Sequence, residues 1–273
     1  SIKEIMEELD IMIEKYNINN IIIYDDCFSA KKERLFEFCK EIKELAKKHK
    51  TLLKWSCQLL VSTVDEEMLE IMKDAGCYNI SYGFESFSPN VLRIMKKPIT
   101  PEQIDKALKL TLKTGISIQG NFIFGDIAET RETAKETIRY WKSSPESQQI
   151  SLGFVQPYPG SDLYRYCLTK GIIKDKINYI QHQMGPDSRI NMTQEMSNEE
   201  IRILSIALLD LFRKYFRFIT PLSLKKEKKK VYQIKIKCPF CKEKISYKNC
   251  FIENRLIYGF HLICRKCFMR FVV

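Results

Sequence analysis

The sequence lacks any apolar run that approaches the roughly 20 residues of a membrane-spanning helix. It also lacks the basic and then apolar layout of a secretory signal peptide, because Ser1 to Glu8 follow an acidic amphipathic pattern. We therefore expect a cytoplasmic protein. A third absence concerns glycine: no glycine-rich phosphate turn follows the first apolar run, which argues against a Rossmann-type sheet.

Excess positive charge is absent from most of the chain. The 273 residues carry a net charge of +11, and residues 221–273 hold 14 of the 45 Lys and Arg but only 3 of the 34 Asp and Glu. The remainder therefore has 31 charges of each sign and is neutral. A neutral body with a basic tail predicts that RNA or DNA would bind to the tail. A solvated lysine linker at residues 225–230 is the alternative.

The cysteines are divided in the same way between the body and the tail. Five cysteines in the body have no regular spacing, as is typical of reduced core cysteines: Cys27, Cys39, Cys57, Cys77 and Cys167. The tail instead holds two CxxC pairs, Cys238/Cys241 and Cys264/Cys267, which are separated by 22 residues. Four thiolates in two such pairs predict a tetrahedral zinc site.

The apolar runs around these pairs are short and rich in β-forming residues, so we expect a zinc ribbon at residues 223–273. Rubredoxin-like iron is an alternative, and so is dithiol exchange, although the βαβ context of redox CxxC motifs is missing. We expect Cys250 and His261 to be packing residues and not ligands. The three expected strands are Val231 to Ile236, Leu256 to Ile263 and Phe268 to Val273.

Basic and aromatic residues are interleaved in the tail, a mixture that suits phosphate contact and base stacking. Ordinary alternation along a two-sided strand would give a similar pattern. The basic residues are Lys235, Lys237, Lys242, Lys244, Lys248, Arg255, Arg265, Lys266 and Arg270, and the aromatic ones are Tyr232, Tyr247, Tyr258 and Phe268.

Strand and helix patterns alternate through the body. Such alternation predicts parallel strands joined by crossover helices, and we favour a partial (β/α)6 TIM-type barrel over residues 1–190. Residues 191–222 form a connector with an amphipathic helix at Asn198–Phe218, which we expect to pack on the barrel. The expected strands are residues 19–24, 52–61, 78–84, 116–124 and 150–155.

Four of these strands end in polar signatures. In a parallel barrel the carboxyl ends of all strands open on one face, so the four signatures predict one shared site and an enzyme. They are Tyr24-Asp25-Asp26-Cys27-Phe28, Tyr82-Gly83-Phe84-Glu85-Ser86, the segment from Gln119 through Gly125 to Thr130, and Gln156 to Ser161.

The ordered set resembles the strand-end motifs of radical S-adenosylmethionine (SAM) enzymes, in the branch shared by methylthiotransferases and cobalamin-dependent proteins. The resemblance covers residues 2–173. It implies that Asp25 and Asp26 lie near the amino group of SAM and that Glu85 and Ser86 face its ribose or methionine part. It also implies that Gln119 and Asn121 line the cavity and that Gly125 allows close approach to the adenine.

Each of these positions also has a purely structural interpretation. Asp25 or Asp26 would cap the following helix, and Glu129 would be a first-turn acid favoured by the helix dipole. Gly160 would belong to a turn, with Ser161 or Asp162 as the cap of the next helix.

One departure from the family pattern is serious. Radical SAM enzymes bind a [4Fe-4S] cluster through a CxxxCxxC motif, and this chain contains none. We expect an upstream segment to supply the cluster loop and a preceding strand, which would leave this chain alone inactive. The alternative is a degenerate, noncatalytic barrel that binds nucleic acid or protein.

With the cluster supplied, the family's chemistry would apply. It generates a 5′-deoxyadenosyl radical from SAM and modifies a substrate by methylation, methylthiolation or rearrangement. Cobalamin is a further cofactor of the branch, in a separate upstream domain.

Overall fold

The computed structural model describes residues 1–143, 149–185, 190–215, 217–252 and 261–273. These residues divide into two compact units, and each is considered by itself. The first comprises Ser1–Tyr82, Gln103–Gly120 and Phe216–Val273. The second comprises Gly83–Glu102 and Asn121–Tyr215.

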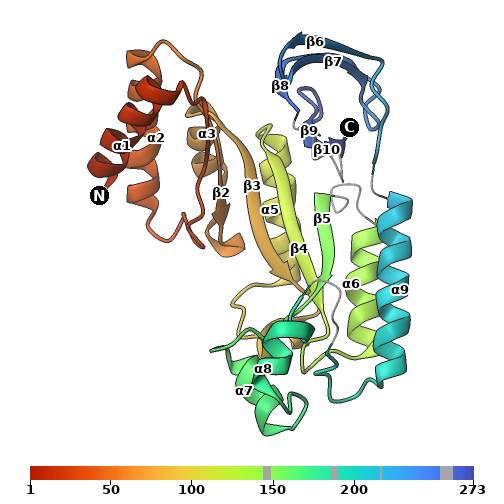
Figure 1. The fold of residues 1–273 in the computed structure, drawn as a ribbon. Coiled ribbons are helices and arrows are strands. Elements are labelled where there is room, and N and C mark those ends of the chain that lie inside the picture. The colour runs from red at the N-terminus through yellow and green to blue at the C-terminus, as the bar shows by residue number, and fades with distance from the viewer. Residues whose placement is uncertain (144–148, 186–189, 216, 253–260) are drawn as a thin grey trace. The chain divides into compact units, whose positions relative to one another are not determined.

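A five-stranded sheet runs through the body in the order β1-β2-β3-β4-β5, which is the order of the sequence (Figure 1). The β1–β2 and β2–β3 pairs are parallel, with Ile22 opposite Ser56 and Ser56 opposite Asn79. The α/β prediction of a parallel partial barrel is therefore confirmed. The strands are β1 (Asn20–Ile22), β2 (Lys54–Leu59), β3 (Cys77–Glu85), β4 (Ser117–Phe124) and β5 (Ile150–Phe154).

Two helices of the first unit, α1 and α3, begin at capping residues that the sequence marks. Ser1 forms a capping box with Glu4, and Asp65 accepts a hydrogen bond from the Met68 N–H. Gly76 follows with φ +94°, where a Cβ would lie 2.4 Å from the Leu53 carbonyl oxygen. The helices of this unit are α1 (Ile2–Tyr16), α2 (Lys32–Lys48), α3 (Glu66–Asp74) and α5 (Pro101–Lys113), with a short η1 (Val61–Thr63).

An aromatic cluster forms the core between α2 and β2. The rings of Phe28, Phe38 and Trp55 contact one another edge to face, with centroids 5.1–6.1 Å apart. Trp55 is fully buried, and its indole N–H donates to the Ala75 carbonyl at 2.8 Å. Buried aromatic groups with satisfied polar atoms fix the position of β2 relative to the helices that flank it.

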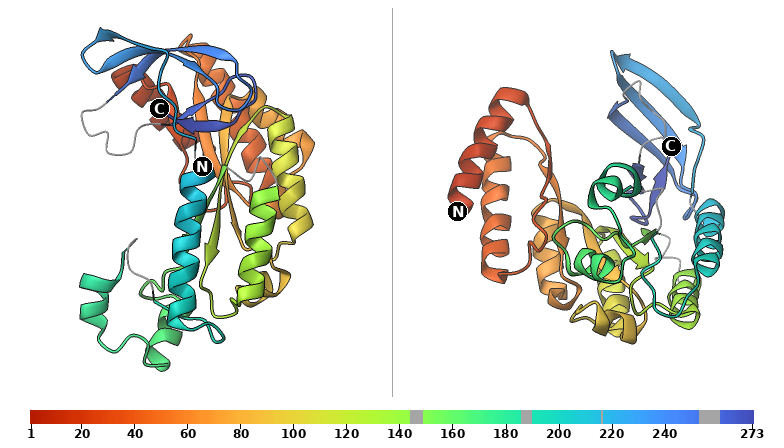
Figure 2. Two further views of the ribbon diagram at one scale, coloured as in Figure 1. Left: turned by 90° about the vertical axis from the view of Figure 1, so that its right-hand side faces the viewer. Right: turned by 60° about the horizontal axis from the view of Figure 1, so that its bottom comes forward.

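In the second unit, α6 and α9 lie side by side (Figures 1 and 2). Their first turns are joined by an ion pair of Arg131 with Glu200, and at their last turns Trp141 contacts Tyr215 with ring centroids 5.1 Å apart. α9 also contacts β5, so the prediction that this helix packs on the barrel is confirmed. The helices are α4 (Pro89–Ile94), α6 (Arg131–Ser143), α7 (Asp162–Thr169), α8 (Lys176–Asn178), η3 (Tyr179–Gln183) and α9 (Asn198–Tyr215).

The tail forms a small β module. β6, β7 and β8 make an antiparallel sheet, and β9 pairs antiparallel with β10. The interpretation of the lysine run as a linker is wrong, because residues 225–228 lie within β6. Strand β8 was also not predicted from the sequence. The expected strand at residues 256–263 lies partly outside the described residues. The strands are β6 (Ser223–Lys228), β7 (Val231–Lys237), β8 (Lys244–Phe251), β9 (His261–Ile263) and β10 (Arg270–Val272).

Among the helices in the described ranges, none is both long and apolar enough to cross a membrane.

Candidate functional site

The loop after β1 carries the first predicted pair. Asp25 and Asp26 are both exposed, and Asp25 lies 3.5 Å from Nη1 of Arg34. The N-cap residue of α2 is Lys31, which has no side-chain capping bond. The interpretation of either aspartate as a helix cap is therefore wrong, and both carboxylates extend into solvent beyond the end of β1.

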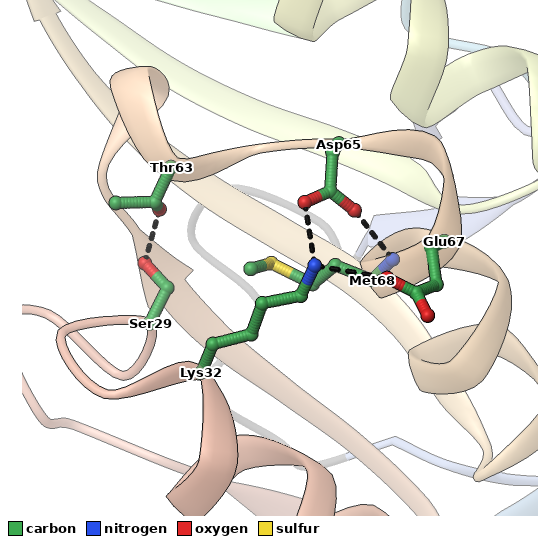
Figure 3. A network of polar contacts seen from close by, with 6 residues as sticks. All are labelled: Ser29, Lys32, Thr63, Asp65, Glu67 and Met68. Atoms are coloured by element: carbon green, nitrogen blue, oxygen red, sulfur yellow. Dashed lines mark hydrogen bonds and ion pairs between the residues drawn. The ribbon is translucent and has the colours of Figure 1, made fainter.

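A polar network ties this loop to the segment after β2 (Figure 3). Thr63 donates to the Ser29 hydroxyl at 2.6 Å. Lys32 donates to Asp65 at 2.9 Å and to Glu67 at 3.0 Å, while the other Asp65 oxygen caps α3. The network holds two consecutive strand ends of the first unit against each other, and thereby positions the Asp25–Asp26 loop.

Glu85 and Ser86 end β3 in a tight turn. Glu85 has φ +61°, and the Ser86 N–H donates to the Phe84 carbonyl at 2.8 Å. The Glu85 carboxylate pairs with Lys97 at 2.7 Å and its side chain is 14% exposed. Ser86 is buried: its hydroxyl contacts Thr137 and accepts from the Ser88 N–H. A non-glycine residue at positive φ stores strain, a feature that is common at functional sites.

Asn121 and Gly125 lie on and just after β4. The exposed Asn121 accepts a hydrogen bond from the Ser151 hydroxyl. Gly125 has φ +84°, and a Cβ there would lie 3.2 Å from the Phe154 ring. Within the second unit, the positive φ and the nearby Phe154 ring are enough to explain why this position is a glycine.

Two buried carboxylates follow Gly125, and sequence reasoning missed their burial. Glu129 is 1% exposed; it accepts hydrogen bonds from the Thr133 hydroxyl and the Gly125 N–H. Burial raises the pKa of Glu129 to about 7. Asp126 is also buried, which raises its pKa, and it accepts from the Ala128 N–H at 3.1 Å. Glu129 precedes α6 by two residues and is not a residue of its first turn.

At the next strand end, one structural expectation is confirmed. Gly160 has φ +91°, and the Ser161 hydroxyl accepts from the Tyr164 N–H at 3.1 Å as the N-cap of α7.

A cavity of about 390 Å³ lies in the first unit, and Gln119 is one of its lining residues. Its Oε1 accepts a hydrogen bond from Nη1 of Arg270 at 2.8 Å. Oδ1 of Asn79 is buried and has no hydrogen-bond partner. The lining residues are Ile22, Ile23, Tyr24, Ser56, Cys57, Gln58, Tyr78, Asn79, Ser81, Gln119, His261, Ile263 and Arg270.

The four tail cysteines form a compact group. The sulfur atoms of Cys238 and Cys267 lie 3.8 Å apart and those of Cys241 and Cys264 lie 3.6 Å apart. All four lie within 4.8 Å of one another, and none is in a disulfide. Two of the four residues are buried.

Two similar backbone turns carry the cysteine pairs. In the first, the Cys238 N–H donates to Glu243, and Lys242, with φ +64°, donates to the Cys238 carbonyl. In the second, the Cys264 N–H donates to Met269, and Phe268, with φ +59°, donates to the Cys264 carbonyl. The matching bonds and left-handed residues place both pairs of sulfur atoms around one point.

These distances fit a single metal ion. Four sulfur atoms at about 2.3 Å from a tetrahedral Zn²⁺ lie about 3.8 Å from one another, which agrees with the observed spacings. A [4Fe-4S] cluster binds each cysteine to a different iron and needs sulfur atoms further apart. The four-cysteine group can therefore hold one metal ion and does not fit the cluster.

The apolar side of the module surrounds this centre. Ile234, Ile236, Tyr247 and Phe271 form its buried core with two of the cysteines, and Cys250 packs against it without joining the metal group. The expectation of a packing role for Cys250 is confirmed. Tyr247 is only 8% exposed, so its proposed use as a stacking platform is wrong.

The ring of Phe268 also packs against other residues of the protein. Its ring lies against Gly115, where a Cβ would be 2.9 Å away, and Nζ of Lys73 lies 4.7 Å from the ring centroid. The prediction that bases stack on Phe268 is therefore wrong. Tyr258 and Arg255, which we also expected to contact nucleic acid, lie outside the described residues.

Comparison with known proteins adds an independent finding. The model of the radical SAM superfamily matches residues 1–140. The chain is 32% identical over 173 residues to an uncharacterized methyltransferase of Pyrococcus horikoshii, covering 63% of this chain and 37% of that protein. It is 27% identical over 191 residues to an anaerobic magnesium-protoporphyrin IX monomethyl ester cyclase of Rubrivivax gelatinosus, covering 68% and 33%.

A solved structure shows the same fold. It is that of a radical SAM methyltransferase of Kitasatospora setae with tryptophan substrate and a SAM analogue bound, with a TM-score of 0.51 and 18% identity over 61% of this chain and 33% of that one. The chain thus spans about a third of the length of these proteins. Because the family model matches half of the chain, the protein belongs to the radical SAM superfamily.

Proposed function

We propose that this chain is the SAM-binding part of a radical SAM enzyme that modifies its substrate by methylation, methylthiolation or rearrangement. The observation that carries the proposal is the match of residues 1–140 to the superfamily, on a sheet whose strand ends carry the polar motifs. The methyltransferase names among the relatives favour methylation of the three reactions.

SAM presents an ammonium, a carboxylate and a ribose diol, so its site needs directional donors and acceptors. The exposed carboxylates of Asp25 and Asp26 suit the ammonium. Glu85 and Asn121 already have partners in Lys97 and Ser151, but each oxygen can accept a further hydrogen bond, so we propose them as acceptors for hydroxyl groups. The side chains of Ser86 and Gln119 also have partners and Gly125 has no side chain, so we propose that these three residues hold the site's shape. When bound, SAM supplies the methyl group or the deoxyadenosyl group of the reaction.

The [4Fe-4S] cluster does not fit the cysteines of this chain. The body cysteines have no CxxxCxxC spacing, and Cys39, Cys57, Cys77 and Cys167 are buried. We propose that the cluster ligands come from a segment upstream of Ser1, with a strand that pairs with β1. Support comes from β1, whose Ile22 is 53% exposed on the first strand in the sheet order. An apolar edge of this kind is usually covered.

In the tail, we propose that the four-cysteine group binds zinc as a structural ion, because its sulfur spacings match tetrahedral Zn²⁺ and its position is in the core of a small module. Cobalamin, a cofactor of the branch that the strand-end motifs resemble, is proposed for a separate domain. We further propose the division into residues 1–190, 191–222 and 223–273, and a cytoplasmic location.

SAM binding can be measured on this chain by isothermal titration. One SAM per chain is expected, with affinity reduced about tenfold by the double change of Asp25→Asn and Asp26→Asn, because a charged hydrogen bond contributes about 1.5–3 kcal/mol. A matched control is Asp105→Asn with Glu132→Gln, which removes two charges elsewhere. Absence of SAM binding, or equal loss in the control, would contradict the proposal.

A second candidate function is nucleic-acid binding by a noncatalytic barrel. One face of the β6–β8 sheet carries exposed lysines, and Lys237 lies opposite Lys244 in the β7–β8 register. Lys225 and Lys235 extend the basic face across β6 and β7. The lysines of this face are suited to contact phosphate groups. The stacking of bases on aromatic side chains, which we also expected, is not part of this candidate.

The test is fluorescence anisotropy with a 20-nucleotide single-stranded RNA and the same DNA sequence. Changing Lys225, Lys235 and Lys244 to Gln should weaken binding at least tenfold and lower its salt dependence. The control changes the exposed Lys40, Lys106 and Lys135, which alters the net charge equally. Equal affinity of both variants, or no binding at low salt, would remove this candidate.

A further inference from the structure

We propose that one face of the sheet in the first unit, formed by β2, β3 and β4, binds an uncharged and hydroxyl-rich part of the enzyme's substrate. The inference rests on the proposed function in one respect, because it names the substrate class of that same enzyme. Three observations carry it: the alternation of side chains along the strands, two buried polar atoms that have no partner, and a cavity that the face lines.

The strands alternate between apolar and polar residues. On the apolar face, Trp55 packs against Phe38 of α2 and the Tyr82 hydroxyl contacts Thr111 of α5, so helices cover this side. Its residues are at most 3% exposed: Trp55, Cys57, Leu59, Ile80, Tyr82 and Ile118. The polar face carries hydroxyl and carboxamide groups instead. Its residues are Ser56 and Gln58 of β2, Asn79 and Ser81 of β3, and Ser117 and Gln119 of β4.

The strand register brings these polar groups together. Ser56 lies opposite Asn79, and Gln58 lies opposite Ser81, in the parallel β2–β3 pair. Gln119 lines the same cavity as these four residues, which places the polar positions of β4 on the same face. Parallel sheets are usually apolar on both faces, and barrel interiors are usually filled by branched apolar side chains. A polar face is therefore not what packing alone would favour here.

Two polar atoms of this face are buried without a hydrogen-bond partner. They are Oδ1 of Asn79 and Oγ of Ser117. Ser56 is also buried, at 8% exposure, so the face is not an ordinary solvated surface. A polar atom that has lost its water and has no protein partner is destabilising, and it commonly marks the place of a ligand group or of an ordered water. We infer that a ligand completes these hydrogen bonds.

A cavity of about 390 Å³ gives this ligand its space. All of the polar-face residues except Ser117 line it. The volume lies near the lower end of the roughly 300–1,000 Å³ that ligand pockets occupy, so it suits one small group. Ile22 of β1 and Ile263 of β9 also line the cavity, and they suit the hydrocarbon skeleton of such a group.

The hydrogen-bonding chemistry of the face favours hydroxyl groups. A hydroxyl both donates and accepts, so it can satisfy the Asn79 oxygen as well as the Ser81 hydroxyl and the Gln58 amide. A carboxylate only accepts and would leave the Asn79 oxygen without a donor, whereas an ammonium only donates. The substrate class is therefore a neutral compound with several hydroxyl groups on a carbon ring or chain, such as a polyol or a glycosyl group.

The experiment uses ligand-detected NMR on the full chain with three probes that share a six-membered carbon ring: myo-inositol, cyclohexanol and quinate. We expect myo-inositol to bind about tenfold more tightly than cyclohexanol, because its additional hydroxyls add hydrogen bonds. Quinate places a carboxylate on a hydroxylated ring. It should bind more weakly than myo-inositol, although Arg270 also lines the cavity.

Two variants test the face itself. Asn79→Ala should weaken myo-inositol binding about tenfold and leave cyclohexanol binding unchanged. Because Oδ1 of Asn79 has no partner in the protein, this variant should keep its stability in urea unfolding, whereas a purely structural role would lower the stability. Ser81→Ala, which removes a hydroxyl from the same face, should also weaken myo-inositol binding. The control is Asn178→Ala, at an exposed asparagine of the second unit, and it should behave as wild type.

Several results would overturn the proposal. They are equal or tighter binding of cyclohexanol or quinate, equal effects of Asn178→Ala and Asn79→Ala, or unchanged myo-inositol binding in both Asn79→Ala and Ser81→Ala. Absence of myo-inositol binding to wild type would also overturn it, because water alone would then complete the face.

Titration of SAM into the same proteins separates this inference from the proposed function. Unchanged SAM affinity in Asn79→Ala, together with lost myo-inositol binding, supports a substrate subsite. SAM itself carries a ribose diol, so competition between SAM and myo-inositol would assign the face to that ribose and contradict the inference. Absence of SAM binding in wild type would contradict the proposed function, while myo-inositol binding would still support the polar face as a ligand site.

Discussion

Nη1 of Arg270 donates a hydrogen bond to Oε1 of Gln119 at 2.8 Å, across 151 positions of the sequence. The bond joins β10, in the metal-binding module, to β4, in the sheet that carries the predicted SAM-site residues. Gln119 lines a cavity of the first unit, and its hydrogen-bond partner comes from the tail. Its place in a SAM site stays a prediction. The module is therefore a part of the cavity's wall as well as a metal centre.

Cys264→Ser should abolish stoichiometric metal binding. Three thiolates cannot complete tetrahedral coordination, and metal binding contributes most of the folding free energy of a module this small. The metal content, measured by mass spectrometry of the purified protein, should fall from one ion per chain to near zero, with faster proteolysis of residues 261–272. Cys250→Ser is the control and should retain the ion. Full metal content in Cys264→Ser would show that the four-cysteine site is wrong.

Gly115→Ala should destabilise the first unit by about 1–3 kcal/mol. Gly115 has φ +77°, and the added Cβ would lie 2.9 Å from the Phe268 ring, so strain and overlap add. Urea unfolding measures the loss, and hydrogen exchange should show faster opening of β9 and β10. Gly153→Ala meets no atom within 4 Å and should stay within about 0.5 kcal/mol of wild type. Equal effects of the two changes would speak against docking of Phe268.

Glu129 should make stability fall as the pH rises between about 4.5 and 7. Burial raises its pKa in the folded protein to about 7 from 4.5, so the folded state keeps a proton that the unfolded state releases. The contribution is full below pH 4.5 and is lost by pH 7, a change on the order of 3 kcal/mol.

The check compares urea unfolding of wild type and Glu129→Gln at pH 5 and pH 8. The neutral amide cannot ionise, so the variant should lose less stability than wild type on going to pH 8. A parallel pH dependence of the two proteins would mean that Glu129 titrates normally.

Asp65→Ala should cost about 1 kcal/mol in thermal or urea unfolding, because Asp65 caps α3 through the Met68 N–H. Its ion pair with Lys32 is partly exposed and adds little. Glu67→Ala removes the other carboxylate that contacts Lys32 and should change stability by less than about 0.5 kcal/mol. If the order of the two effects were reversed, the ion pairs and not the cap would hold this loop.

The parts of the fold that local patterns encode could be predicted. Asp65 and Gly76 bound α3 because capping and left-handed φ are properties of single residues, and the two CxxC pairs identify a metal group through their spacing alone. The linker prediction for residues 225–228 was wrong because exposed lysines are equally compatible with a linker and with an edge strand. Only the pairing with β7 shows that these residues form a strand.

The site depended more on contacts between distant residues. Nothing in the sequence near Phe268 indicates that its ring packs on Gly115, and nothing near Arg270 indicates Gln119. Glu129 looked like a helix-dipole acid because burial is set by the packing around the Gly125 turn. The motif order nonetheless identified the family, since strand-end residues converge by topology whatever their long-range contacts.

The central claim is that this chain binds SAM and that a CxxxCxxC segment upstream supplies the cluster. The direct measurement is formation of 5′-deoxyadenosine from SAM after anaerobic reconstitution with iron, sulfide and a reductant, for this chain alone and for the chain extended by the coding sequence before Ser1. We predict product from the extended protein and none from the chain alone. Product from the chain alone, or an extended protein that carries no CxxxCxxC and forms none, would contradict the account.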